Sequence, residues 1–170
     1  KVKLLDSGMY YFKNPTKPRL RAVTWGLFER LDGGEQFIVM NTHWAINSEG
    51  SHLRLEAAEE MASLALSLRE KYGAPVFITG DYNCNETSEE YLLFIEKSGF
   101  ADPKYDSEKI GVACSTYHTI GTPAKTGTLP GIDHITVSKD VELLYYNTLV
   151  DDNVVNASDH LPIYIDVFIK

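Results

Sequence analysis

Short apolar runs that border polar motifs constrain the fold of this chain more than any other feature. Four such motifs occur in a fixed order: N-T-H at 41–43, G-D-Y-N at 80–83, I-D-H at 132–134 and S-D-H-L-P at 158–162. Each motif places acids, amides or imidazoles where a strand is expected to end, and α/β proteins assemble their sites at strand ends. One motif alone predicts no more than a turn, so it is the set that indicates a common site.

The runs beside these motifs predict a β-α-β-α order in the middle of the chain. Residues 20–28 and 37–40 are β-rich and predict neighbouring strands of a hairpin. The continuous apolar run at 37–40 favours a strand covered on both faces, and 76–78 has the same composition. Apolar residues recur at three- and four-residue spacing over 53–68, which predicts an amphipathic helix that ends at Gly73.

A second helix is predicted from Thr87, with Glu90 completing a capping box, to about Ser98. Residues 119–131 contain three Gly and two Pro, which predicts a loop that reaches the site. Three β-rich segments follow in succession, at 132–137, 141–150 and 163–169. At 170 residues and 44% hydrophobic, the chain is long enough for one core, and we expect a single domain over 1–170.

The charge distribution limits the classes of partner. A net charge of −8 does not support sequence-blind binding of nucleic acid through a broad basic surface. The first 21 residues are basic and could meet an anionic substrate or a lipid headgroup, but a solvated edge is the preferred interpretation. No apolar stretch has membrane-spanning length. Because the chain begins at Lys1, an upstream segment is not excluded and the localisation is left open.

Taken together and in this order, the four motifs resemble the endonuclease/exonuclease/phosphatase superfamily, the exonuclease III and DNase I-like proteins, whose members hydrolyse phosphate esters with a divalent metal. The resemblance runs from about residue 20 to the end and covers the second half of that family's domain. It implies an α/β fold: the second half of a four-layer α/β/β/α sandwich, with a mostly antiparallel or mixed sheet and flanking helices. Residues 1–170 would then be a partial domain that lacks its N-terminal half.

The resemblance assigns catalytic roles to five side chains. Asp81 would orient or deprotonate the attacking water, and Asn83 would contact the phosphate. His160 would act on the water or the phosphate, with Asp133 accepting the other ring N–H of His160. His43 would contact the scissile phosphate and assist the leaving group. The alternatives are an Asx-type turn at the second motif, a cap or turn at the fourth, and a buried core histidine at the first.

Further residues complete the expected site. The resemblance makes Asp159 a carboxylate on the metal side, with Mg²⁺ or Mn²⁺ as the cofactor. Arg54 could bind a substrate phosphate, and a surface or ion-paired arginine is an equal alternative. Thr116-Tyr117 resembles the Ser/Thr-aromatic segment that lines the family's pocket, with packing of the Tyr117 ring as the alternative. His134 should point away from Asp133 along its strand. The family's main metal-binding Glu belongs to the first half, so no residue here takes that role.

The leading hypothesis is a metal-dependent phosphoesterase that hydrolyses a phosphodiester or phosphomonoester by in-line attack of an activated water. The substrate type stays open, and nucleic acid is among the candidates. The rival is a non-catalytic module that binds a phosphorylated ligand or a protein partner on the same scaffold, and a weaker third is a thiol-dependent enzyme using Cys84. If the other half normally covers the inner face of the sheet, we expect this fragment to be incomplete, to expose an apolar face and to self-associate through it.

Overall fold

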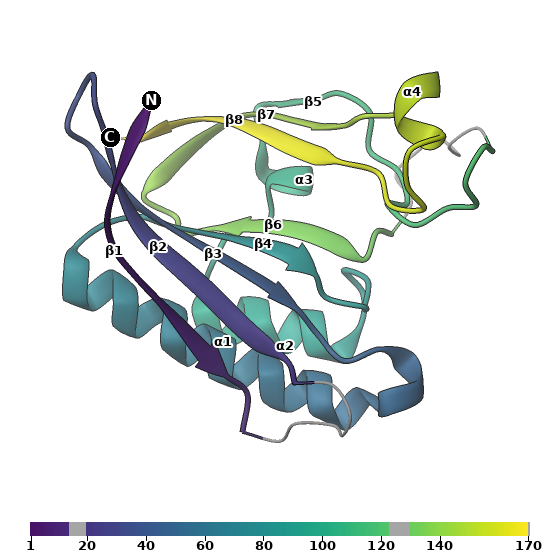
Figure 1. The fold of residues 1–170 in the computed structure, drawn as a ribbon, viewed down its shortest axis with the longest axis horizontal. Helices are drawn as coiled ribbons and strands as arrows, with labels where there is room; N and C mark the ends of the chain where they lie inside the picture. The colour runs from purple at the N-terminus through teal and green to yellow at the C-terminus, as the bar shows by residue number, and fades with distance from the viewer. Residues whose placement is uncertain (14–19, 123–129, 170) are drawn as a thin grey trace.

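A computed structural model describes residues 1–13, 20–122 and 130–169. They form three layers, in which helices cover one face of a five-stranded sheet and a three-stranded sheet lies over part of the other face (Figure 1). The first sheet has the order β1 (Val2–Tyr11), β2 (Ala22–Arg30), β3 (Gln36–His43), β4 (Val76–Asp81), β6 (Asp133–Val137). The second has the order β5 (Lys109–Ile110), β7 (Val141–Thr148), β8 (Ile163–Ile169).

Both sheets are mixed, as the resemblance implies. Strands β3 and β4 run parallel because the long helix α1 (Ser51–Tyr72) connects them, whereas β1–β2, β2–β3 and β4–β6 are antiparallel. In the second sheet, β5–β7 is parallel and β7–β8 antiparallel. The α/β fold with mixed sheets and flanking helices is therefore confirmed. The three β-rich segments near the end of the chain are strands, but they are divided between the two sheets.

The helices follow the sequence pattern closely. The buried residues of α1 include Ala57, Met61 and Leu68, which belong to the predicted apolar stripe, and Gly73 ends the helix in the left-handed conformation that glycine accepts without strain. Helix α2 (Glu89–Ser98) begins two residues after Thr87, and its N-cap is Ser88, whose hydroxyl accepts from Tyr91 N. The predicted capping box at Thr87 and Glu90 is wrong. Shorter helices are η1 (Asn47–Glu49), α3 (Pro103–Asp106) and α4 (Asp152–Val155). No helix of the described residues is long and apolar enough to cross a membrane.

The main core lies between α1, α2 and the five-stranded sheet. Trp44 and Tyr82, which follow β3 and β4, are fully buried and stack with ring centroids 4.4 Å apart, and Phe94 of α2 contacts both rings edge-on. Burying aromatic side chains of this size contributes on the order of 2–3 kcal/mol each. Because both rings follow directly after strand ends, this packing fixes the polar motifs beside them.

The opposite face of the five-stranded sheet is only partly covered. Leu4 and Met9 of β1 are more than half exposed, and Phe28 and Val39 are half-buried. In the 37–40 run only Ile38 and Met40 are fully buried, so the prediction of a strand covered on both faces is only half met. The expected apolar face is present, and self-association through it stays a prediction. The sequence analysis did not predict β1, which is an edge strand on which Lys3 is exposed. Of the predicted loop, residues 123–129 lie outside the described residues.

Candidate active site

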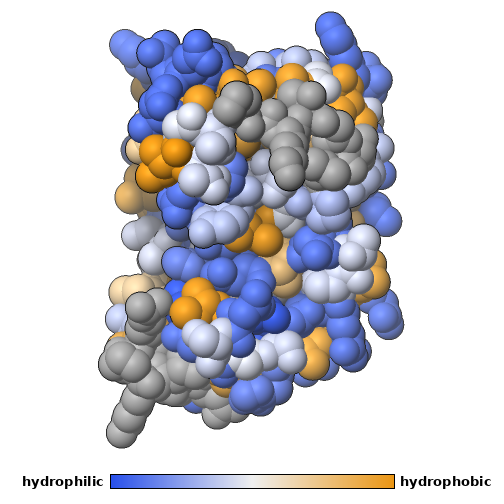
Figure 2. Space-filling view, turned by 90° about the vertical axis from the view of Figure 1, so that its right-hand side faces the viewer, coloured by the Kyte–Doolittle hydropathy of each residue, from blue (hydrophilic) through white to orange (hydrophobic). Residues whose placement is uncertain are grey.

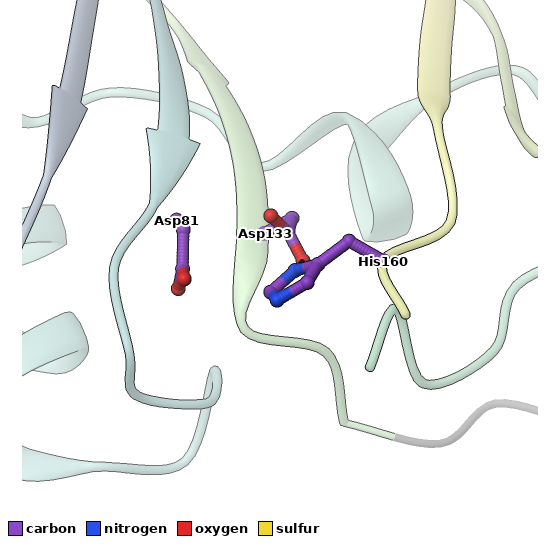
Figure 3. A group of neighbouring side chains, drawn as sticks. All are labelled: Asp81, Asp133 and His160. Carbon is purple, nitrogen blue, oxygen red and sulfur yellow. Dashed lines mark hydrogen bonds and ion pairs between the residues drawn. The ribbon is translucent and has the colours of Figure 1, made fainter. Parts of the chain in front are cut away.

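The polar motifs meet at one end of the five-stranded sheet. Parallel pairing of β3 with β4 sets His43 beside Asp81, and antiparallel pairing of β4 with β6 sets Asp81 beside Asp133. His160 reaches the same place from the segment before β8, which belongs to the other sheet. Figure 3 shows Asp81, Asp133 and His160 directed into a common space. Four side chains from distant parts of the sequence therefore share one site.

Gly80 is required for the close approach of β3 and β4 at this end. Its φ of 150° is a conformation that side-chain-bearing residues rarely adopt. A Cβ added there would lie 2.1 Å from the carbonyl oxygen of Thr42 on the neighbouring strand. The glycine before Asp81 thus allows the two strand ends, and the side chains that they carry, to come together.

The expected contact between His160 and Asp133 is present. Asp133 Oδ2 lies 2.8 Å from His160 Nδ1, and the two side chains are 21% and 32% exposed. The Ser158 hydroxyl accepts from the His160 backbone N–H at 3.0 Å and fixes the turn that carries the imidazole. Partial burial lowers the pKa of His160, but the hydrogen bond to Asp133 and nearby negative charges outweigh it, so the pKa is raised. The imidazole is held with Nδ1 on Asp133, while its catalytic role stays a prediction.

Asp81 occupies the middle of the group. Burial, followed by the negative charge of Asp133, raises its pKa, although the Asn83 backbone N–H donates to Asp81 Oδ1 at 2.8 Å and opposes the shift. His43 Nε2 lies 3.4 Å from Asp81 Oδ2 and its side chain is 56% exposed. Its raised pKa makes Asp81 a stronger base than an ordinary aspartate, and an exposed imidazole lies beside it.

Asn83 makes contacts that hold the ends of two strands together. It has a φ of 52°, which asparagine tolerates, and its N–H to Asp81 makes the Asx-type turn that was the alternative interpretation. Its side-chain Nδ2 donates to the Trp44 carbonyl at 3.1 Å and ties the end of β4 to the end of β3. Asn83 is not among the residues that line the cavity, so contact with a phosphate stays a prediction.

A cavity of about 570 Å³ surrounds these side chains. Figure 2 looks onto this end of the molecule and shows a hollow bordered by hydrophilic residues, with hydrophobic ones among them. The charged or titratable residues of its lining are His43, Asp81, Asp133, His134 and His160. Among the described residues, the lining contains two carboxylates and neither lysine nor arginine. An anionic substrate would meet two carboxylates and the imidazoles beside them here.

Three of these side chains could hold a cation. One ligand atom from each of Asp81, Asp133 and His160 lies within 4.8 Å of the others. Mg²⁺ and Mn²⁺ prefer carboxylate oxygens as ligands, and two are present here. An imidazole is a weaker ligand for these ions than for softer metals. The donor set thus fits the metal implied by the resemblance. Asp159, the residue expected on the metal side, is exposed and does not belong to this group, so its role stays a prediction.

The remaining predicted residues lie in three different settings. Arg54 is buried: Nε and NH2 bond Glu90 Oε1 at 2.9 and 2.8 Å, and NH1 donates to the Ala45 carbonyl. The ion-paired alternative therefore applies to Arg54, whose guanidinium is not directed at the cavity. Tyr117 is 56% exposed, and its ring lies edge-on to His160 at 5.3 Å, where a bound substrate could contact it. His134 points away from Asp133 into the core, as expected, with Nε2 2.8 Å from the Cys84 carbonyl.

Sequence reasoning did not identify every residue around the site. Thr116 is buried, and its hydroxyl accepts the backbone N–H groups of Ile132 and Asp133. Asn41 and Thr79 line the cavity and bond each other at 2.9 Å. In this contact the Thr79 hydroxyl donates to Asn41 Oδ1, which links the ends of β3 and β4. The resemblance pointed to Thr116 as part of the Thr116-Tyr117 segment, but not to its partners, because a buried hydroxyl that accepts from a distant strand has no local pattern.

No family model matches the sequence, and no curated protein matches it. Among solved structures, an endonuclease/exonuclease/phosphatase family protein from Bacteroides thetaiotaomicron superposes with a TM-score of 0.85 at 24% identity, over 98% of this chain and 66% of that one. A mannosyl-6-phosphatase from the same organism gives 0.84 at 23%, over 99% and 67%. The human Nocturnin catalytic domain, with bound sulfate, gives 0.69 at 18%, over 99% and 60%.

The likeness extends along the whole of this chain but along only about two thirds of each of those structures. At these identities it is the arrangement of strands and helices that is shared. The chain has the fold of the endonuclease/exonuclease/phosphatase family proteins.

Proposed function

We propose that the protein is a metal-dependent phosphoesterase of the endonuclease/exonuclease/phosphatase family, which hydrolyses a phosphate ester by in-line attack of water. The single observation that supports this most strongly is the meeting of His43, Asp81, Asp133 and His160 in one cavity, on a fold shared with a phosphatase. Activation of water needs a base, and protonation of the leaving group needs an acid. Carboxylates and imidazoles can serve in both roles. Side chains that only stabilised the core would not need to meet in one solvent-accessible cavity.

The residues would divide the reaction between them. Asp81, with its raised pKa, would accept the proton of the attacking water. His160, held by Asp133 through Nδ1, presents Nε2 for the phosphoryl oxygen or the water. His43, more exposed and 3.4 Å from Asp81, would act at the leaving-group side. Asn83 would chiefly orient Asp81 through its backbone N–H, and a direct phosphate contact is a weaker proposal.

The charge of the cavity supports a cation. Two carboxylates face the space where a phosphate would bind, and the described lining offers no lysine or arginine to balance them. Without a counter-charge, a dianionic or monoanionic phosphate would be repelled. The carboxylates of Asp81 and Asp133 would hold Mg²⁺ or Mn²⁺, and His160, the third member of the group, would keep Nε2 available for the water. When bound, such an ion neutralises phosphoryl oxygens and favours attack by water.

The substrate class is a phosphomonoester or phosphodiester. The likeness to a mannosyl-6-phosphatase supports a phosphomonoester, whereas the open cavity beside exposed Tyr117 would also accept an aromatic or base-bearing leaving group. Because the chain spans about two thirds of the similar structures, the activity proposed is that of the whole protein.

Turnover of bis(p-nitrophenyl) phosphate and of p-nitrophenyl phosphate by the full-length protein, with Mg²⁺ or Mn²⁺, tests the proposal. His160→Ala and Asp81→Asn should each lower kcat by about 10²- to 10⁴-fold, the usual contribution of a general acid or base. His52→Ala and Asp166→Asn are matched controls, because both side chains are exposed and outside the cavity. The controls should keep the parent rate.

Two outcomes would contradict the proposal. If the parent hydrolyses neither ester with either metal but still binds inorganic phosphate in a metal-dependent way, the non-catalytic binding module is the better interpretation. If turnover occurs but survives both His160→Ala and Asp81→Asn, a different part of the molecule carries the chemistry.

A further inference from the structure

Thr116 contacts the backbone on both sides of the His160–Asp133 pair. Its side chain is 1% exposed, and Oγ1 accepts from Ile132 N at 3.1 Å and from Asp133 N at 3.0 Å. Its carbonyl oxygen accepts from Leu161 N, the residue after His160, at 2.7 Å. One residue therefore bonds the start of β6, which carries Asp133, and the segment before β8, which carries His160.

The two partners of the pair need such a link because they belong to different sheets. Asp133 lies in the five-stranded sheet, whereas His160 leads into β8 of the three-stranded sheet. Among the described residues, β6 and β8 share no hydrogen-bonded ladder that would fix their spacing. Hydrogen bonds between nitrogen and oxygen weaken beyond about 3.2 Å, so a relative shift of roughly half an ångström would weaken the 2.8 Å contact.

A buried ion pair supports Thr116 from behind. Gly131 N–H donates to both carboxylate oxygens of Glu86, at 3.1 and 3.2 Å, and Lys104 Nζ lies 2.5 Å from Glu86 Oε1. A Cβ on Gly131 would lie 3.2 Å from Thr116 Cγ2 and 3.3 Å from Oγ1. The Gly131 backbone is thus held by Glu86 on one side and packs directly on Thr116 on the other.

We propose that Thr116 is a positioning residue that sets the distance between Asp133 and His160, and so the tautomer and aim of the imidazole. The bonds to Asp133 N and Leu161 N fix the two backbones, and the Glu86 and Lys104 pair prevents Gly131 from moving away. The catalytic meaning of this positioning rests on the proposed phosphoesterase function. The positioning itself is a property of the folded protein and can be observed without a substrate.

Three variants separate the hydroxyl from its surroundings. Thr116→Val keeps the shape and removes the acceptor of two buried N–H groups, whereas Thr116→Ser keeps the acceptor. Gly131→Ala leaves the hydroxyl in place and pushes on it through the added Cβ. Thr148→Val is the matched control, because Thr148 is equally buried but lies in β7, outside the cavity.

Two measurements on the full-length protein follow the pair. The Nδ1–H tautomer of His160 is read from ¹⁵N shifts at a pH where the ring is neutral, and kcat and KM are measured with bis(p-nitrophenyl) phosphate and Mn²⁺. In the parent, Thr116→Ser and Thr148→Val, the Nδ1–H tautomer should dominate. In Thr116→Val it should give way to a mixture, and kcat should fall by about 10²-fold with KM nearly unchanged, the size expected for misplacement of a catalytic group. Gly131→Ala should show a smaller change in the same direction.

The proposal is overturned if Thr116→Val and Gly131→Ala both keep the parent tautomer. Should Thr116→Val not fold, Gly131→Ala decides alone. A parent protein that shows the fixed tautomer but no turnover would contradict the proposed function and leave the positioning by Thr116 standing. A parent with full turnover and variants with unchanged tautomers would contradict Thr116 alone.

Discussion

The buried ion pair of Glu86 and Lys104 offers a test of how the region behind the cavity is stabilised. The two side chains are 5% and 4% exposed, their charged atoms are 2.5 Å apart, and Glu86 also accepts from Gly131 N. The informative perturbations are Glu86→Gln, Lys104→Met and the double variant. Gln keeps the length of Glu and one carbonyl oxygen for Gly131 N, so that it removes mainly the charge.

The magnitudes follow from the burial of both groups. Removing one partner of a buried ion pair leaves the other charge in a poorly solvated place, which costs about 3–5 kcal/mol in the free energy of unfolding. Replacing both charges by neutral groups of similar volume avoids that penalty and is often nearly neutral. We therefore expect each single variant to lose about 3–5 kcal/mol, and the double variant to lose at most about 2 kcal/mol. The implied coupling energy is several kcal/mol, well above the experimental error of a double-mutant cycle.

Urea denaturation of the four proteins, followed by fluorescence of Trp44 and Trp25, measures this cycle. Asp32→Asn is a useful control, because the Arg30 to Asp32 pair has similar geometry, with Arg30 NH2 2.9 Å from Asp32 Oδ2, but is largely exposed. Its removal should leave the midpoint unchanged. Single losses that simply add in the double variant, with coupling below about 0.5 kcal/mol, would refute the view that the two charges depend on each other.

Three further predictions concern single positions. Gly80→Ala should lower the free energy of unfolding by about 2–4 kcal/mol, because of backbone strain and the clash with the Thr42 carbonyl oxygen. Gly34 also has a positive φ but has open space around it, so Gly34→Ala should lose less. Equal losses in thermal unfolding would contradict this. Burial raises the pKa of Asp102 to about 6, so its stabilising contribution is present below pH 4 and lost as pH rises through 6. The free energy of unfolding of Asp102→Asn should therefore rise relative to that of the parent between pH 4 and 7, by up to roughly 3 kcal/mol. A difference in urea denaturation that does not change with pH would argue against this. Burial raises the pKa of Cys84 to about 12, so iodoacetamide at neutral pH should not alkylate this thiol and should leave the activity unchanged. Rapid alkylation of Cys84 in the native protein would contradict this prediction.

Most of the secondary structure was predictable from local patterns. The apolar stripe of α1, the glycines that end both long helices and the β-rich runs of β3 and β4 act through neighbours a few residues away, so the sequence displays them directly. The strand β1 was missed because its apolar residues are interspersed with a lysine and an aspartate, as is common at an edge that is largely exposed.

The partners of charged residues were not predictable in the same way. Glu90 has the spacing of a capping box with Thr87, but in the fold it pairs with Arg54 from the other helix. Arg54 in turn cannot be told from a phosphate-binding arginine until the packing of α1 against α2 is known. Local spacing specifies which chemistry a residue can perform, whereas tertiary packing decides which of several partners it meets.

The same distinction explains why the site was found but its support was not. His43, Asp81 and Asp133 are brought together by strand pairing, and a strand end followed by a polar motif is visible in the sequence. Thr116 acts through backbone N–H groups that every residue possesses, so nothing at 132 or 133 marks them as its partners. A hydroxyl that accepts two N–H bonds inside a core is nonetheless costly to replace, because both donors lose their acceptor at once. Sequence reasoning therefore recovers the polar groups that gather at the candidate site, and the structure is needed to find the contacts that hold them together.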